Sequence, residues 1–325
     1  MVTFRYELYG LVIDSDRPLY VGNIEPNAGR PADVVIRHAP TELASRLPRG
    51  DELLLHYRHP EFSYFCERSE DGSFSLVFTD ACEFQISADL RQVTVHRHSG
   101  ALDGIEDVLA AGAQMAWQLY MRGSLVLHGS AVETERGAVA FIGNSGMGKS
   151  TMATLMCAAG GKVITDDLLR VDFIDDVPVV RLGSSELRLR KGADTLSESF
   201  DSAPGRRSSA DHRQLLQPQG AAQDRVPLRA IFVPVPERDE TRVRIDRIRA
   251  TDAIFAVMKF PRLLGWLDPS VRERQFQLLS QLARSVGLSI AYVPWGPPFS
   301  DEIPAAILAE IGRAREGRRL DLSLS

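Results

Sequence analysis

The sequence predicts an α/β protein of the α+β type, in which a β-rich N-terminal region precedes a region that mixes strands and helices. Short apolar or alternating runs fill the first part of the chain, and an apolar stripe with helical spacing follows them. Further along, a glycine-rich motif stands between a strand-like run and a helix-like segment. We therefore expect a β-rich domain at 1–100, a connecting helix at 101–123 and a second domain with a mixed sheet at 124–325.

Strands are expected in the N-terminal region where apolar runs lie between Gly, Pro, Asn or Asp residues. This pattern is typical of antiparallel sheets. The expected strands are 6–13, 33–37, 52–57, 73–78, 83–87 and 92–96. Between Leu102 and Arg122 apolar residues recur at positions i, i+3 and i+4, which predicts an amphipathic helix that joins the two domains, with Gly112 on its apolar stripe.

The second region alternates strand and helix patterns. Strands are expected at 125–133, 138–142, 162–166, 168–173, 179–183, 228–235, 241–247 and 288–293. Helices are expected directly after the glycine-rich motif and near 251–259, 270–286 and 302–316. Residues 200–227 carry Pro, Gly, Ser and Gln but few apolar residues, so we expect a long, partly mobile loop there.

Composition argues against several classes of function. The 325 residues include 38 basic and 43 acidic ones, a net charge of -5, which does not favour nucleic acid as a partner. The three cysteines form no C-x-x-C pair and indicate neither a disulfide framework nor a zinc site. Because neither a signal peptide nor a long apolar span is evident, we expect a cytoplasmic protein without a membrane partner. A homo-oligomer is compatible with the sequence.

The glycine-rich motif is a complete phosphate-binding loop of the form G-x-x-x-x-G-K-[ST]. Backbone N–H groups of such a loop, at the start of a helix, form a cradle for phosphate oxygens. Lys149 is expected to reach the β and γ phosphates, and the Ser150 hydroxyl to bind Mg²⁺. We predict that a nucleoside triphosphate contacts Gly143, Asn144, Ser145, Gly146, Met147, Gly148, Lys149, Ser150 and Thr151.

A hairpin is expected to bring a histidine to this loop. The two apolar strands before the loop are separated by a turn-like segment, and folding the chain about Glu135 and Arg136 places His128 opposite Gly143. An isolated histidine in an apolar strand is usually a packed core residue. This register favours instead an active-site role for His128.

Two adjacent aspartates, Asp166 and Asp167, follow the strand that is expected after the loop helix. A right-handed crossover makes this strand run parallel to the loop strand, so its end lies at the same edge of the sheet. One carboxylate could then hold Mg²⁺ while the other accepts a proton from an attacking hydroxyl. The residues alone do not decide which carboxylate takes which role, and a helix cap or a turn is the alternative for both.

A second hairpin is expected directly afterwards, with its turn at Asp175 and Asp176. This hairpin would return Ser184, Ser185 and Glu186 to the two aspartates. Glu186 is therefore a candidate metal ligand or second acid. The alternative is a solvated strand residue.

Two cationic groups follow this hairpin. Arg188 and Arg190 alternate with leucines, with Lys191 just beyond, and Arg206 and Arg207 lie in the long loop. Either group could meet the carboxylate of a peptide. A solvated strand face and a mobile linker are the alternatives.

The histidine segment Leu127-His128-Gly129, the phosphate loop and Asp166-Asp167, in this order, resemble the catalytic domain of HPr kinase/phosphorylase. The resemblance implies a mixed sheet related to phosphoenolpyruvate carboxykinase, and a reaction in which ATP phosphorylates a protein serine. It also implies that His128 is an active-site histidine and that Asp166 is the base that activates serine.

The resemblance implies further that Lys149 and Ser150 bind phosphate and Mg²⁺, and that Asp167 lies on the metal side. The layout of the whole chain, with its opening Tyr6–Leu11 segment and β-rich front, is similar to HPr-kinase-like proteins found with lasso peptides. Such relatives phosphorylate the C-terminal serine of a ribosomally made precursor peptide, so the implied partner is a peptide or protein with an accessible serine. A kinase of a small hydroxylated metabolite and a non-catalytic nucleotide-sensing module are the alternatives.

Overall fold

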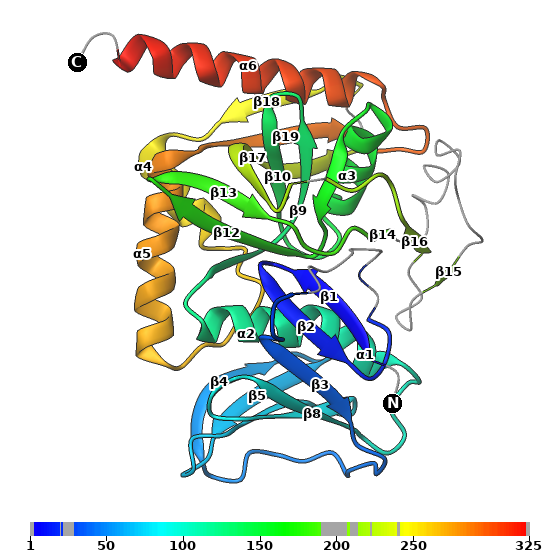
Figure 1. Cartoon of the computed structure of the whole chain (residues 1–325). Coiled ribbons are helices and arrows are strands. Elements are labelled where there is room, and N and C mark those ends of the chain that lie inside the picture. The colour runs from blue at the N-terminus through cyan, green and yellow to red at the C-terminus, as the bar shows by residue number, and fades with distance from the viewer. Residues whose placement is uncertain are drawn as a thin grey trace.

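The computed structural model describes residues 3–19, 21, 29–189, 207–208, 214–221, 223–238 and 241–322. It has a mixed α/β fold with two large sheets, one N-terminal and one that carries the phosphate-binding loop (Figure 1). The first sheet comprises β1 (Phe4–Leu8), β2 (Leu11–Ser15), β3 (Val34–His38), β4 (Glu52–Arg58), β5 (Ser63–Arg68), β6 (Phe74–Phe78), β7 (Cys82–Ile86) and β8 (Gln92–Arg97).

The second sheet comprises β9 (Leu125–Thr134), β10 (Gly137–Ile142), β11 (Lys162–Thr165), β12 (Leu168–Ile174), β13 (Val177–Arg181), β17 (Arg225–Glu237), β18 (Arg244–Arg247) and β19 (Gly287–Pro294). A third, small sheet comprises β14 (Leu187–Leu189), β15 (Arg207–Ser208) and β16 (Gln214–Leu216). The α-helices of the second region are α3 (Lys149–Ala158), α4 (Ala250–Val257), α5 (Pro269–Ser285) and α6 (Glu302–Leu322). Their positions match the predicted helices to within a few residues, except that α6 extends further.

The first sheet has the strand order β1-β2-β3-β8-β7-β6-β5-β4. From β8 to β4 neighbouring strands pair antiparallel, as predicted. β3, however, pairs parallel with both β2 and β8, so the expectation of an antiparallel sheet is wrong there. The long connection between β2 and β3 permits this crossover. β5 was not predicted, because Tyr64, Phe65 and Cys66 are consecutive buried apolar residues without alternation.

The predicted strand 6–13 is a hairpin instead. β1 and β2 pair antiparallel along their whole length, and Tyr9 and Gly10 form the turn with φ angles of 54° and 74°. Positive φ at both central residues is what a tight hairpin turn requires. The apolar pattern continues across the turn and for that reason predicts a single strand.

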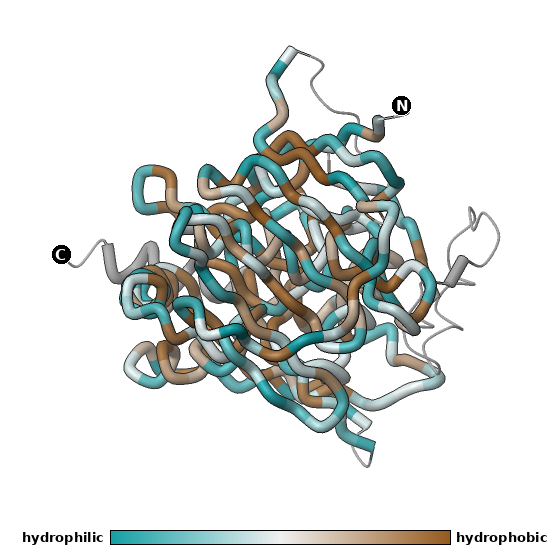
Figure 2. The backbone as a smooth tube through the Cα atoms, turned by 90° about the horizontal axis from the view of Figure 1, so that it is seen from below, coloured by the Kyte–Doolittle hydropathy of each residue, from teal (hydrophilic) through white to brown (hydrophobic). Residues whose placement is uncertain are grey.

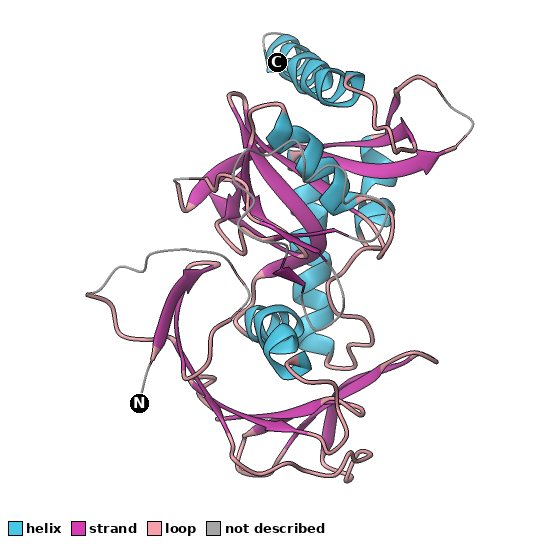
Figure 3. Ribbon diagram, turned by 90° about the vertical axis from the view of Figure 1, so that its right-hand side faces the viewer, coloured by secondary structure: helices cyan, strands magenta, loops and turns pink. Residues whose placement is uncertain are grey.

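The predicted connecting helix lies between the two large sheets (Figure 3). It consists of α1 (Ile105–Leu109), a π-helical segment η1 (Ala110–Gln114) and α2 (Met115–Met121). Every residue from 110 to 120 is buried, so the expectation of an amphipathic helix is wrong. A helix that packs against sheets on two sides is buried all round, and here the buried residues include Gln114 and Gln118. Gly112 lies in the π-helical segment, a distortion of the kind that often occurs at functional sites.

The second sheet runs β10-β9-β12-β13-β17-β19-β18, with β11 on β9 and an additional pairing of β17 with β10. Its first hairpin turns at Glu135 and Arg136, as predicted. β10, β17 and β19 are mutually parallel. β11 has the same direction as β10, because each pairs antiparallel with β9. The carboxyl ends of these four strands therefore lie at one edge, which we call the carboxyl edge, and the phosphate-binding loop leaves β10 there.

The second predicted hairpin forms β12 and β13, with Asp175 and Asp176 at its turn. Their φ angles are 48° and 61°. The predicted loop 200–227 is wrong in part, because β15 and β16 pair within it and β17 begins at Arg225. Residues 200–206, 209–213 and 222 lie outside the described residues.

Hydrophobic segments run mainly through the interior of the molecule (Figure 2). Local signals also set helix ends: Asp268 accepts hydrogen bonds from the backbone N–H groups of Ser270 and Val271 and caps α5, and Pro269 occupies its first turn. In the part of the chain that the structure describes, no helix is long and apolar enough to cross a membrane.

Candidate active site

The phosphate-binding loop connects two elements that the sequence predicted. All residues of β10 after Gly137 are buried, as expected for an apolar strand covered on both faces. Gly146 and Gly148 then have φ angles of 91° and 84°, which residues with a side chain rarely adopt. Gly148 immediately precedes α3, so the loop amides stand at a helix N-terminus, where the helix dipole favours anions.

Lys149 is folded back over this loop. Its side chain is only 6% exposed, and its Nζ donates to the Asn144 carbonyl oxygen at 2.9 Å. The ammonium therefore adds its charge to the positive potential of the helix start. This is the position that a lysine needs in order to meet phosphate oxygens bound by the loop.

His128 lies beside the first residue of the loop, as the hairpin register predicted. The backbone N–H of Gly143 donates to the His128 carbonyl oxygen at 3.3 Å. The imidazole is close enough to Lys149 for the ammonium charge to lower its pKa.

Asp166 lies on the side of the loop serine. The Ser150 hydroxyl is 2.9 and 3.1 Å from the two carboxylate oxygens of Asp166. Ser130 donates to the same carboxylate at 2.5 Å, and the backbone N–H of Arg188 at 2.9 Å. Asp166 is 4% exposed, and these donors supply the hydrogen bonds that a buried carboxylate requires.

Asp167 faces a different set of partners. Its φ angle is 68°, and this turn of the backbone separates the two adjacent side chains. One carboxylate oxygen lies 3.3 Å from His128 Nε2, and the other lies 2.7 Å from Arg262 Nη2. Arg262 is positioned by the connecting helix, because its backbone N–H donates to the Tyr120 hydroxyl at 3.1 Å.

The charges at this contact follow from its geometry. Burial alone would raise the pKa of the Asp167 carboxyl, but Arg262 and His128 more than offset it and hold the pKa well below its ordinary value. Burial lowers the pKa of His128, and Asp167 offsets this only in part. Asp167 is therefore ionised and His128 is neutral near neutral pH. Because Nε2 faces the carboxylate, Nε2 carries the hydrogen and the lone pair of the ring is on Nδ1.

The residues around Ser150 suit Mg²⁺. A hydroxyl and a carboxylate are hard oxygen ligands, and Mg²⁺ usually binds one or two carboxylates together with substrate phosphates and water. Within the described ranges no group of three or more His, Cys, Asp or Glu residues could hold a metal. A site of this kind would therefore be completed by the phosphates and not by protein ligands alone.

The segment after the second hairpin returns as expected, because the Asp166 backbone N–H donates to the Ser184 carbonyl oxygen at 3.1 Å. Glu186 is buried, and its charge raises the pKa of Tyr6 in the first sheet. Glu186 is expected to join the two aspartates as a metal ligand, but among the described residues it forms no metal-binding group of three with them. Arg188 lies near the site and lowers the pKa of Asp167.

Several cationic residues singled out in the sequence cannot be placed. Arg190, Lys191 and Arg206 lie outside the described residues, as does the side chain of Arg207.

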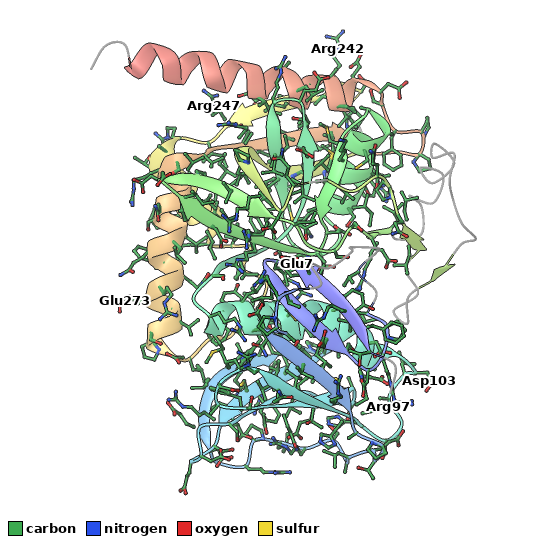
Figure 4. All side chains as sticks on the ribbon, viewed as in Figure 1. Glu7, Arg97, Asp103, Arg242, Arg247 and Glu273 are labelled. Carbon is green, nitrogen blue, oxygen red and sulfur yellow. The ribbon has the colours of Figure 1, made fainter. Side chains whose placement is uncertain are left out.

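The tip of the first hairpin lies at the junction of the two large sheets, where Figure 4 labels Glu7 on β1. The Tyr9 backbone N–H donates to the Leu182 carbonyl oxygen at 2.6 Å, and the Tyr9 hydroxyl accepts from the Ser184 N–H at 3.3 Å. Tyr9 is buried, and a Cβ on Gly183 would lie 2.1 Å from its ring. The first sheet thus supports the segment that closes over Asp166.

Three residues of the site were not predicted. Ser130 could have been found, because it lies two residues after His128 and alternate residues of a strand share a face. Arg262 and Tyr9 carry no local motif and lie far from Asp167 in the sequence, so only the tertiary fold identifies them.

Comparisons with known proteins add little to this geometry. No protein-family model and no curated protein matches the sequence. Among solved structures, the HPr(Ser) kinase/phosphatase from Coxiella burnetii is similar with a TM-score of 0.29 and 9% sequence identity, over 61% of this chain and 98% of that chain. At this TM-score the likeness does not establish a shared fold, and the function is inferred from the residues of the site.

Proposed function

We propose that the protein is an ATP-dependent serine kinase, which uses Mg²⁺ and transfers the γ-phosphate to a serine hydroxyl of a peptide. One observation carries this proposal: adjacent carboxylates face different halves of one site. Asp166 contacts the loop serine Ser150, and Asp167 contacts His128 and Arg262. A binding module needs only the first of these halves, whereas a phosphotransferase needs both.

The first half binds the phosphates. The loop amides and Lys149 neutralise charge on the β and γ phosphates. Their stabilising effect is largest in the transition state, in which charge develops on the transferring group. Ser150 and Asp166 would hold Mg²⁺, which when bound neutralises phosphate charge.

The second half receives the acceptor. The serine oxygen forms a bond to the γ-phosphorus as the bond from phosphorus to the β,γ-bridging oxygen breaks, and ADP leaves with that electron pair. The serine proton passes to Nδ1 of neutral His128, which Asp167 orients through Nε2. Arg262 keeps Asp167 ionised and in place.

This division of roles differs from the one that the family resemblance implies, in which Asp166 is the base and Asp167 lies on the metal side. The support for our division is that the Ser150 hydroxyl contacts both oxygens of Asp166. Variants separate the two divisions. If Asp166 binds metal, Asp166→Asn weakens Mg-ATP binding and raises the Mg²⁺ requirement, whereas an Asp166 base predicts unchanged Mg-ATP binding with lost transfer.

The acceptor that we propose is a serine at the C-terminus of a peptide, as in a lasso precursor. Such a peptide presents a carboxylate beside its serine. The charge of Arg188 lowers the pKa of Asp167, so Arg188 lies near the acceptor half, where its guanidinium would meet the carboxylate of such a peptide. We expect the peptide and the chain to meet in the cytoplasm, where ATP is present.

The experiment is to incubate the full chain with Mg-ATP and synthetic peptides that end in serine, and to look for added phosphate by mass. Matched peptides that end in alanine, and the Lys149→Ala variant, are the controls. We expect phosphate on the serine peptides alone and none with Lys149→Ala. Transfer to small hydroxylated metabolites only would establish the metabolite kinase instead, and binding of ATP without any transfer would establish a sensing module.

A further inference from the structure

An apolar cleft lies directly beside the phosphate-binding loop. Its walls include Met147, Gly148 and Thr151 from the loop and α3, Pro236 from β17, and Trp295 and Phe299 from the segment after β19. The cleft is narrow: it leaves about 10 Å³ for the centres of water-sized molecules, which is room for about one water. Among the described residues that line it, the Thr151 hydroxyl and the indole N–H of Trp295 are the polar side-chain groups.

The topology of the second sheet explains why this cleft and the loop meet. β10, β17 and β19 are parallel, so their carboxyl ends share the carboxyl edge. Trp295 is the first residue after β19, and its backbone N–H donates to the Glu237 carbonyl oxygen at the end of β17, at 2.9 Å. Ligands of α/β sheets bind at such an edge. The cleft therefore continues the phosphate site.

Trp295 is the unusual residue of this cleft. It is 41% exposed, whereas Trp117 of the connecting helix is fully buried. Its ring lies against the last glycine of the loop, because a Cβ on Gly148 would be 3.7 Å from Trp295 Cζ3. An indole that is half-exposed beside a phosphate cradle offers a flat surface to an aromatic ligand.

We propose that the base of the bound nucleoside triphosphate stacks on the exposed part of Trp295, at the mouth of this cleft. The proposal rests on the proposed function, because the phosphates must first occupy the loop. Gly148 and Thr151 lie where the loop and the cleft join, so a ligand whose phosphates occupy the loop extends toward the cleft. The aromatic base is the part of that ligand that matches apolar walls. Stacking tolerates any base, so the site accepts adenine and guanine alike.

The experiment is a calorimetric titration of the full chain with Mg-ATP, Mg-GTP and Mg-tripolyphosphate, which lacks a base. Trp295→Ala is expected to weaken both nucleotides by about 5- to 150-fold, the equivalent of about 1–3 kcal/mol for one stacked base. Tripolyphosphate binding stays unchanged, and Trp295→Phe restores most of the nucleotide affinity. Phe255→Ala, which removes an aromatic side chain that is 67% exposed on α4, is the matched control.

Two results would overturn the base site but leave the proposed function standing. In the first, the Trp295→Ala variant binds ATP with the affinity of the unchanged chain; in the second, Trp295→Ala weakens the binding of tripolyphosphate as much as that of ATP. In both cases triphosphates still bind, and Lys149→Ala still weakens that binding. If the unchanged chain binds neither nucleotide nor tripolyphosphate, the proposed function fails, and the base site fails with it.

Discussion

Two histidines of this molecule lie against aspartate carboxylates, in surroundings of different charge. His38, at the end of β3, lies between two of them: its Nδ1 is 2.7 Å from Asp16 Oδ1, and its Nε2 is 3.0 Å from Asp107 Oδ1. His128, beside the phosphate-binding loop, faces Asp167 at 3.3 Å, and an arginine shares that carboxylate.

Burial alone lowers the pKa of both imidazoles. At His38 the two carboxylates more than offset burial and raise the pKa, although Arg17 opposes them. At His128 the single carboxylate does not offset burial, and Arg262 and Lys149 lower the pKa further. The number of carboxylates for each cation thus decides whether the surroundings favour the charged form of the imidazole, as at His38, or its neutral form, as at His128, which can accept a proton.

Breaking the His38 cluster is expected to give the largest effect. Asp107→Asn removes one partner of a buried ion pair, a change that typically costs about 3–5 kcal/mol. Because Asp16 remains, we expect the free energy of unfolding to fall by about 3 kcal/mol in urea denaturation. Glu52→Gln, in the exposed pair with Arg68, should cost less than about 1 kcal/mol. Equally small losses for both variants would mean that the His38 cluster does not stabilise the fold.

The second prediction exchanges the two histidines for glutamine and measures phosphate transfer to a serine peptide. His128→Gln is expected to lower the rate by about 100-fold or more, the lower end of what a general base contributes. His38→Gln should leave the rate per folded molecule unchanged, because His38 is remote from the carboxyl edge. Equal losses of rate in the two variants would show that His128 acts through stability alone.

The smallest expected effect is the dependence of stability on pH, in which each unit of pKa shift changes the free energy of unfolding by about 1.4 kcal/mol. His38 has a raised pKa in the folded state, so its stabilisation is complete below about pH 6.5 and is lost as the pH rises through the folded pKa. His128 has a lowered pKa, so stability is lost in the opposite direction, as the pH falls from about 6.5 through its folded pKa.

Denaturation of the chain without nucleotide across this pH range checks both signs. His38→Gln should remove the loss of stability on the alkaline side, and His128→Gln should remove the loss on the acid side. Losses on the same side for both histidines would contradict the assigned charge states.

Local chemistry explains which parts of the fold could be predicted. The glycines of the phosphate loop and the turn at Asp175 and Asp176 are local signals, and the elements on both sides of each were predicted. The connecting helix and β3 were predicted, but the amphipathic character of the helix and the antiparallel pairing of β3 were wrong, because packing between two sheets and a parallel crossover leave no short-range pattern. The turn at Tyr9 and Gly10 was hidden by apolar residues that continue across it.

The same distinction applies to the site. Gly143, His128 and Asp166 are placed by one hairpin and one crossover, whose geometry follows from the sequence. The partners of the two aspartates depend on backbone angles at Asp167 and on Arg262, a residue that belongs to the segment between α4 and α5. The sequence therefore indicated the chemical groups of the site, and their pairing required the structure.

Equilibrium binding of Mg-ATP tests the central claim, a triphosphate site at the carboxyl edge, most directly. Calorimetry would compare the unchanged chain with Lys149→Ala and with Lys162→Ala, a lysine at the start of β11 and thus away from the carboxyl edge. We predict that the unchanged chain and Lys162→Ala bind with equal affinity, and that Lys149→Ala is weaker by about 10- to 150-fold, the equivalent of about 1.5–3 kcal/mol for a hydrogen bond to a charged group. Binding that is absent, or that is the same in Lys149→Ala, would contradict the account.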